Sequence, residues 1–336
     1  MTNQEILKIA MAQSAIDLCA APADFEKSEN VIVTSRENEG ARRYLKLPFS
    51  CQLVSYGNNV VASVSPGFRE IAENYINKYP VEHLFETPHL HVLNDMLLKK
   101  GQKICFMAEY FLPDVDVLCE RGGVPTSYLK ACDFDSARDP TAEGGRPSGF
   151  DCVRPCHPER SAAESNCKAA PSVAKAGSRA DFAQDDTRKL TCQNSDITNR
   201  YELRLLTQAD FADLYLTEWS NALCKDRKQL DVLGVGAYDS GKLVGLAGCS
   251  ADCEQMWQIG IDVLPDYRRQ GIASALTSRL ATEILARGKV PFYCAAWSNI
   301  KSVRNAIRSG FRPAWVEMTA KSIETVDGMN GFTNEK

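Results

Sequence analysis

The most constraining feature of this chain is the stretch at residues 258–273, QIGIDVLPDYRRQGIA, which reads as a strand followed by the start of a helix. Branched apolar residues alternate through residues 258–263, and Pro265 ends that run. From Ile272 the apolar spacing becomes helical, and it continues until Gly288. A strand that turns directly into a helix presents free backbone N–H groups at the strand end, where an anion can bind.

The side chains at this junction favour a pyrophosphate ligand. Gly271 lets a ligand approach the backbone without meeting a Cβ atom, and Ala273 keeps the next contact position small. Arg268 and Arg269 add positive charge beside the positive end of the helix dipole. The spacing Arg-x-x-Gly-x-Ala is neither the three-glycine dinucleotide pattern nor the phosphate loop that ends in Gly-Lys-Ser/Thr. An ordinary strand-to-helix turn on a Rossmann-like sheet is the alternative interpretation.

The junction resembles the acetyl-CoA signature of the GNAT N-acetyltransferase superfamily, in which Arg-x-x-Gly-x-Gly/Ala follows a strand ending in Val-x-Pro-x-Tyr-Arg. The resemblance continues through a strand at 290–297 and a helix from Asn299 that closes on Gly310-Phe311, and it covers residues 201–322. It implies the element order β, α, β, β, β, α, β, α, β. The residues predict the first of these helices from Phe211 through Leu214 and Tyr215 to Trp219, and a hairpin turn at Asp239-Ser240-Gly241. The implied fold is of the α/β (α+β) class, with a mixed, mostly antiparallel central sheet flanked by helices.

Composition and periodicity divide the chain into four parts. The first part is patterned like a folded unit, with a hairpin turn at Gly57-Asn58 and helices that begin at Pro66 and Pro88. The second part is dominated by Gly, Pro, Ser, Ala and charged residues and shows no sustained period. The predicted units are an N-terminal α+β domain at 1–118, a low-complexity, disordered insert at 119–199, the GNAT-like domain at 200–322 and a tail at 323–336.

Two peptides in the insert, at 155–161 and 181–186, resemble the translation of a dispersed bacterial DNA repeat. We therefore interpret residues 122–198 as an insert that the fold tolerates passively. A regulatory or partner-binding linker is the alternative. Cys152, Cys156-His157 and Cys167 could also be drawn as a zinc site, but their spacing matches no common zinc knuckle, so no metal is predicted.

The overall composition argues against nucleic-acid and membrane partners. The net charge is −4, with 39 Lys and Arg against 43 Asp and Glu, which gives no general attraction to nucleic acid or anionic lipid. No apolar run approaches the roughly 20 residues that span a bilayer. The N-terminus is an amphipathic helix with acidic residues rather than a secretion signal, and the 13 cysteines are scattered and odd in number. These features predict a cytoplasmic protein with reduced thiols.

The resemblance implies that acetyl-CoA is the co-substrate, and it assigns the contacts to this cofactor. A strand edge would pair with the pantetheine arm, the arginine–glycine junction would hold the pyrophosphate, and Asn299 would touch the arm. Asn299 could also serve only as the N-cap of its helix. The implied cofactor-binding residues are Ile261, Val263, Arg268, Arg269, Gly271, Ile272, Ala273, Ser274 and Asn299.

The general acid that is usual in the family is missing. Many members carry a tyrosine five residues before the Phe of the Gly-Phe pair, where it protonates the departing thiolate. This chain has Ala306 at that position. Ser302, one helical turn earlier, and Tyr293 on the preceding strand are the candidate catalytic replacements.

The usual general base is missing as well. Many relatives place a carboxylate on the opening strand, where the one carboxylate of this chain is Asp262. Because successive strand residues face opposite sides, Asp262 lies on the face opposite the one that usually receives the base. Glu218 is the candidate base, and Asp252, Glu254 or a chain of water molecules are the alternatives.

Taken together, the sequence predicts a cytoplasmic bacterial N-acetyltransferase that transfers an acetyl group from acetyl-CoA to a primary amine of a small molecule or peptide. Transfer would be direct, within a ternary complex. The resemblance extends loosely to bacterial GNAT acetyltransferases with two domains. A CoA-binding sensor or pseudoenzyme is the alternative, because Ala306 and the apolar strand face lack the usual catalytic groups. No oligomeric state is predicted.

Overall fold

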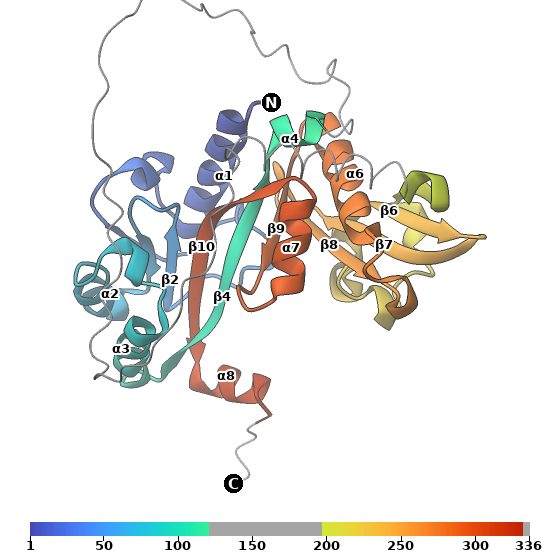
Figure 1. Cartoon of the computed structure of the whole chain (residues 1–336). Helices are drawn as coiled ribbons and strands as arrows, with labels where there is room; N and C mark the ends of the chain where they lie inside the picture. The colour runs from blue at the N-terminus through green and yellow to red at the C-terminus, as the bar shows by residue number, and fades with distance from the viewer. Residues whose placement is uncertain (121–196, 332–336) are drawn as a thin grey trace, which may run out of the picture.

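The computed structural model describes residues 1–120 and 197–331, and these residues build one ten-stranded sheet with the order β1-β3-β2-β10-β4-β9-β8-β7-β6-β5 (Figure 1). Only the β1–β3 and β8–β9 pairs are parallel, and the other neighbours are antiparallel. Helices flank the sheet. The predicted mixed, mostly antiparallel sheet with flanking helices is therefore confirmed.

The N-terminal part contains the elements that its turn residues and caps predict. Thr2 caps the first helix in a capping box with Glu5. Gly57, with a φ of 105°, makes the turn of the predicted hairpin. The elements are α1 (Asn3–Leu18), β1 (Val31–Thr34), β2 (Cys51–Ser55), β3 (Val61–Val64), α2 (Arg69–Ile76), α3 (Thr87–Leu98), β4 (Gln102–Pro113) and α4 (Val115–Glu120).

After the undescribed residues, a helical turn at 197–200 leads to β5, and the C-terminal part then follows the expected order with one difference. Ser240 and Gly241 both have positive φ, which matches the right-handed twist of the tight β6–β7 hairpin. The elements are β5 (Glu202–Thr207), β6 (Asp231–Asp239), β7 (Lys242–Ser250), β8 (Met256–Val263), α6 (Ile272–Ala286), β9 (Val290–Ala295), α7 (Ile300–Arg308), β10 (Phe311–Ser322) and α8 (Ile323–Met329).

The difference concerns the helix predicted from Phe211 to Trp219, which is wrong. The segment forms two short 3₁₀ turns instead, Gln208–Phe211 and Thr217–Trp219. Its apolar side chains Phe211 and Trp219 pack, together with Leu223, against one face of the sheet in a small core cluster. Tertiary packing of these widely spaced residues replaces a continuous helix here.

The two parts of the chain share their sheet rather than each closing its own. Strand β4 lies between β9 and β10, which are consecutive in the chain but do not pair with each other. On its other edge β10 pairs with β2. A strand from the N-terminal part therefore completes the C-terminal sheet, as the neighbouring blue-green β4 and red β10 show in Figure 1. The largest core cluster likewise contains residues of both parts, such as Phe111 and Leu276.

The predicted insert at 119–199 lies almost wholly outside the described residues. The domain boundaries at 118 and 200 stay predictions. The C-terminal tail predicted at 323–336 contains α8. Ser322 is the N-cap of this helix, and its hydroxyl accepts a hydrogen bond from the Thr325 N–H at 3.2 Å. The candidate zinc ligands at 152–167 are also outside the described residues.

The shared sheet makes a prediction about fragments. Residues 197–336 expressed alone should not fold, because β9 and β10 would each expose an unpaired edge and an apolar face. Co-expression with residues 1–120 should give a soluble one-to-one complex, which gel filtration and circular dichroism would detect. A fragment 197–336 that unfolds cooperatively by itself would contradict this description of the sheet.

Candidate active site

The strands β8 and β9 run parallel and then part. They pair only from Met256↔Val290 to Gln258↔Phe292, although β8 continues to Val263 and β9 to Ala295. On its other side β8 stays paired with β7 as far as Val263. The parting therefore leaves one edge of β8 without a strand neighbour.

The backbone of this free edge points into the gap. The Leu264 N–H donates to the Val244 carbonyl at 3.0 Å, so the even-numbered residues at this end of β8 bond to β7. In an antiparallel pair the bonding direction alternates, so the N–H and C=O groups of Ile261 and Val263 face the gap. An extended ligand that carries amides could pair with this edge as an added strand.

The turn that follows β8 depends on unusual backbone angles. Gly271 is the N-cap of α6 with a φ of 89°, and Arg269 has a φ of 63°. Both values lie in the left-handed region, which glycine adopts without strain. The first N–H groups of α6, from Ile272 onward, have no acceptor earlier in their own helix. This end of the helix thus offers an anion the N–H groups and the positive end of the dipole.

Arginine and serine side chains are held around this turn. The Arg268 Nε donates to the Val263 carbonyl at 2.9 Å, so its guanidinium folds back over the end of β8. The Ser274 hydroxyl donates to the Gly271 carbonyl at 3.0 Å. The structure therefore gathers eight of the predicted cofactor residues along one line, from the free strand edge to the first turn of α6: Ile261, Val263, Arg268, Arg269, Gly271, Ile272, Ala273 and Ser274.

The ninth predicted cofactor residue, Asn299, caps α7 and accepts a hydrogen bond from the Ser302 N–H at 3.3 Å. Ser302 lies in the first turn of this helix. Its hydroxyl is 2.7 Å from the hydroxyl of Tyr293 on β9, so the two candidate acids form one hydrogen-bonded pair. Burial raises the pKa of Tyr293 against the opposing effect of its hydrogen bonds, which keeps this phenol protonated at neutral pH. Ala306 is fully buried on the same helix.

The carboxylate candidates differ in their surroundings. Asp252 is buried and forms an ion pair with Arg227, so its carboxylate has a structural role and no access to solvent. Glu254 is exposed. Glu218 is also exposed, in the 3₁₀ turn Thr217–Trp219, and its side chain makes no hydrogen bond or ion pair with a residue of the described ranges.

Asp262 has a structural task on the opposite face of β8. Its carboxylate accepts hydrogen bonds from the Asn221 N–H at 2.8 Å, the Ala222 N–H at 3.0 Å and the Asn221 side-chain amide at 2.7 Å. The same segment lies so close to Gly260 that an added Cβ would be 1.8 Å from the Asn221 carbonyl oxygen. The backbone around Asn221 therefore covers β8 on the face away from α6.

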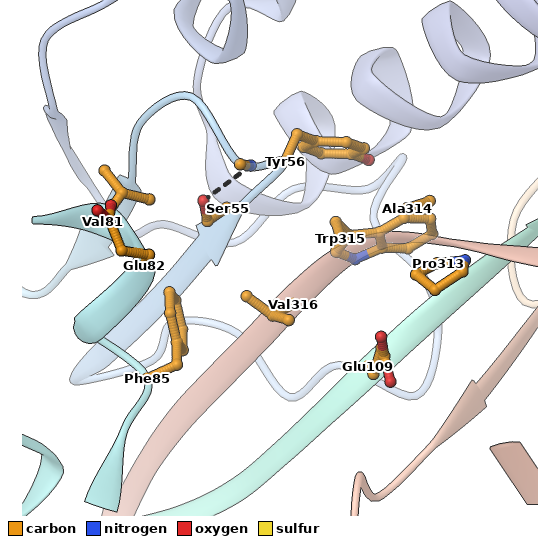
Figure 2. Close-up of a pocket in the computed structure, with 11 residues that line it drawn as sticks. Ser55, Tyr56, Val81, Glu82, Phe85, Glu109, Pro313, Ala314, Trp315 and Val316 are labelled. Carbon is orange, nitrogen blue, oxygen red and sulfur yellow. Dashed lines mark hydrogen bonds between the residues drawn. The ribbon is translucent and has the colours of Figure 1, made fainter. Parts of the chain in front are cut away.

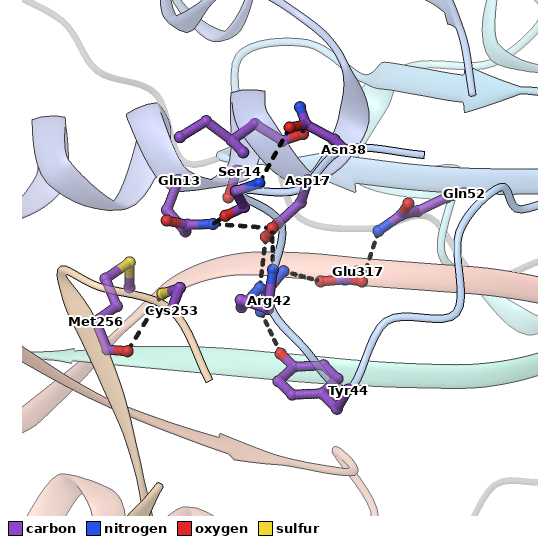
Figure 3. A network of polar contacts seen from close by, with 12 residues as sticks. Gln13, Ser14, Asp17, Asn38, Arg42, Tyr44, Gln52, Cys253, Met256 and Glu317 are labelled. Atoms are coloured by element: carbon purple, nitrogen blue, oxygen red, sulfur yellow. Dashed lines mark hydrogen bonds and ion pairs between the residues drawn. The ribbon is translucent and has the colours of Figure 1, made fainter. Parts of the chain in front are cut away.

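A buried ion network on that same face was not predicted from the sequence. Arg42, 2% exposed, pairs with Asp17 of α1 and, at 3.1 Å, with Glu317 of β10 (Figure 3). Gln52 of β2 donates to the second Glu317 oxygen at 2.8 Å. Although burial disfavours the charged form, the negative charges of Asp17 and Glu317 hold the pKa of Arg42 well above its ordinary value. The network joins the N-terminal helix and loop to the last strand.

The network reaches the place where β8 and β9 part. The Arg42 guanidinium lies 5.9 Å from the centre of the Phe292 ring, and Phe292 is the last residue of β9 that pairs with β8. Beyond it, the Gln258 amide donates to the Cys294 sulfur at 3.1 Å. Burial raises the pKa of the Cys294 thiol to about 11, so this cysteine is not a thiolate at neutral pH. No short-range pattern could reveal these contacts, because their residues are up to 275 positions apart.

The described residues contain neither a membrane-spanning helix nor a cluster of metal ligands. None of the helices in residues 1–120 and 197–331 combines the length and the apolarity that a membrane span needs. Within the same ranges, His, Cys, Asp and Glu side chains nowhere gather in a group of three or more that could hold a metal ion.

Comparison with known proteins gives one family match. A family model described as GNAT acetyltransferase matches residues 164–314, a range that contains β5 to β9, α6, α7 and the start of β10. A search of curated proteins gave no match.

Several solved structures are also similar to this chain. A GCN5-related N-acetyltransferase-like protein from Streptococcus suis is 22% identical, with 40% of this chain and 55% of that chain covered and a TM-score of 0.33. A putative GNAT-family acetyltransferase from Novosphingobium aromaticivorans is 20% identical, with 35% of this chain and 55% of that chain covered and a TM-score of 0.31. A GNAT-family acetyltransferase from Colwellia psychrerythraea is 17% identical, with 36% of this chain and 50% of that chain covered and a TM-score of 0.29. This chain thus spans about half the length of these proteins.

The ion network makes a prediction about stability. Arg42→Met leaves Asp17 and Glu317 buried without a counter-ion, so the free energy of unfolding should fall by about 3–5 kcal/mol. Arg43→Met removes the same charge from the neighbouring, exposed position and should change the free energy of unfolding by less than about 0.5 kcal/mol. Urea unfolding of the two variants measures the difference. Equal stability of both variants would show that the network contributes nothing.

Proposed function

We propose that this chain, whose C-terminal part is a GNAT acetyltransferase domain, transfers an acetyl group from acetyl-CoA to a primary amine of a small molecule or peptide. The observation that carries the proposal is the free edge of β8 directly before the N-terminus of α6. One end of this line suits the amides of a pantetheine arm and the other suits a pyrophosphate. The proposal includes a cytoplasmic location and a bacterial origin.

In this proposal each part of the gap has its own task. The backbone of Ile261 and Val263 pairs with the pantetheine arm, and the N–H groups from Ile272 to Ser274 hold the pyrophosphate. Arg268 and Arg269 supply positive charge beside it. Asn299 both caps α7 and contacts the arm. The thioester then lies where β8 and β9 begin to part.

The reaction is direct attack of a neutral amine on the thioester carbonyl. The new C–N bond forms, the tetrahedral intermediate collapses, and the C–S bond breaks to release CoA as a thiolate. The Tyr293–Ser302 pair supplies a proton to this thiolate, with Ser302 as the donor and Tyr293 re-protonating it. Their contact across β9 and α7 supports a shared role in place of the tyrosine that Ala306 replaces.

The proton that the amine loses goes to a solvent-exposed acceptor. Asp252 and Asp262 are unsuitable because an ion pair and three hydrogen bonds already engage them. Glu218 is the remaining protein candidate, in the segment that covers β8 on the face away from α6. The acceptor amine would enter from that face, near Gln258 and Cys294.

A second candidate function is a CoA-binding sensor without turnover. Two observations favour it: Ala306 stands at the position of the usual acid, and the nearby aspartates are engaged in structure. Both functions need the same cofactor seat, so only turnover separates them.

Release of free thiol from acetyl-CoA, followed across a panel of primary amines, separates the two. The transferase predicts thiol release that depends on the amine and one N-acetylated product per thiol. Binding of acetyl-CoA without amine-dependent release, across small amines and peptides with free amino groups, would favour the sensor.

The proposed acid makes a more specific prediction. Ser302→Ala and Tyr293→Phe should each lower kcat by about 10- to 100-fold, since an acid helps a thiolate leave less than it helps a poorer leaving group. The dissociation constant of acetyl-CoA should stay the same. Ser298→Ala, at an exposed position just before α7, is the matched control and should behave like wild type. Unchanged kcat in both variants would remove the pair from the mechanism.

A further inference from the structure

A second cavity lies apart from the gap between β8 and β9. It has a volume of about 350 Å³ and opens between the end of β2, the strands β4 and β10, and the turn before α3 (Figure 2). Its wall is mostly apolar and aromatic, with Tyr56, Phe85, Trp315 and Val316 among its residues. A volume in this range is typical of sites for small organic molecules. None of these residues belongs to the proposed cofactor seat.

An irregularity in β10 shapes this cavity. The pairing of β10 with β4 shifts between Pro313 and Trp315, which places Ala314 as an extra residue. Such bulges redirect side chains and are frequent beside binding sites. Trp315 stacks on Tyr56 and Tyr110, with ring centres 5.4 Å and 4.6 Å apart. The indole is therefore held between the two tyrosine rings, and only its edge can line the cavity.

Two polar groups of this wall have no partner among the described residues. Trp315 is only 3% exposed, and its buried Nε1 makes no hydrogen bond. The side chain of Glu109 on β4 makes no hydrogen bond or ion pair within residues 1–120 and 197–331. Burial raises the pKa of Glu109, as expected for a carboxylate that lacks a nearby cation. Leaving the buried indole N–H without an acceptor has a cost that a bound ligand could offset, whereas the half-buried Glu109 carboxylate is solvated and lacks only a counter-ion.

The charge of the wall selects the class of ligand. Glu109 and Glu82 both line the cavity, and no Lys, Arg or His of residues 1–120 and 197–331 does. An anionic ligand would meet two carboxylates, and a purely apolar ligand would leave Glu109 without a counter-ion. A cation satisfies Glu109, because an ammonium group can pair with its carboxylate.

We propose that this cavity binds a small organic ammonium compound with an aromatic or aliphatic body. The ammonium group pairs with Glu109, the body lies against Tyr56, Phe85 and Trp315, and an oxygen of the ligand can accept the indole N–H. This site is separate from the acetyl-CoA seat: it lies on the far side of β9, since Glu109 is the neighbour of Ala295 in the β4–β9 pair. Binding there needs neither acetyl-CoA nor turnover.

Calorimetric titration of the full-length protein tests the charge requirement with three probes of one shape. We expect 2-phenylethylamine to bind at neutral pH, and 2-phenylethanol and phenylacetate to bind at least about tenfold more weakly. Binding of the alcohol as tight as that of the amine would overturn the proposal. So would the absence of amine binding at millimolar concentrations.

Variants place the binding in this cavity. Glu109→Gln should lower the affinity for 2-phenylethylamine about tenfold or more. Glu73→Gln, which removes an exposed carboxylate from α2, should leave this affinity unchanged. Trp315→Phe should remove the change in tryptophan fluorescence that the amine causes. An amine affinity equal in the Glu109 and Glu73 variants would contradict the assignment. Titration of acetyl-CoA into Glu109→Gln should match wild type, so failure of this site and failure of the proposed cofactor seat are distinguishable.

Discussion

The pairing of β4 with β10 is the constraint on which the rest of this structure depends. It runs from Phe311↔Pro113 to Ser322↔Gln102 and places a strand of the N-terminal part inside the C-terminal sheet. Because β4 also pairs with β9, it fixes the strand that forms one side of the candidate active site. The buried ion network around Arg42 acts on the same junction, since it ties α1 and the following loop to β10. A buried ion pair adds little net stability, but it penalises any arrangement that leaves one partner alone.

The candidate active site lies at a place where this sheet is incomplete. Strands β8 and β9 start as a pair and then part, so backbone groups of β8 that would bond to β9 in a continuous sheet have no strand neighbour. The left-handed turn at Gly271 brings the start of α6 directly behind this opening. A chain of backbone N–H and C=O groups therefore leads from the strand edge to the helix terminus. Near it, burial raises the pKa values of Tyr293 and Cys294, so both are protonated at neutral pH and neither serves as the general base.

The sequence predicted much of the local structure, because its signals are local. Gly57-Asn58 and Asp239-Ser240-Gly241 identified both hairpins, and the Arg268–Gly271 spacing identified the β8–α6 turn. The helix at Phe211–Trp219 was predicted wrongly because packing against the sheet, rather than periodicity, decides that segment. Long-range features were not predictable: nothing near β4 indicates that it pairs with β10 some 200 residues later. Arg42 and Arg43 look alike in sequence, yet one is buried in an ion network and the other is exposed.

The most direct test of this account is calorimetric titration of acetyl-CoA into wild-type protein and two glycine variants. Gly271→Glu places a strained, negatively charged side chain at the N-cap of α6, where the pyrophosphate is proposed to lie. Gly67→Glu adds the same charge at a position with ordinary φ and open space around it. The account predicts that wild type and Gly67→Glu bind acetyl-CoA alike, and that Gly271→Glu, while still folded by circular dichroism, does not bind it. Equal binding by all three proteins would contradict the proposed seat.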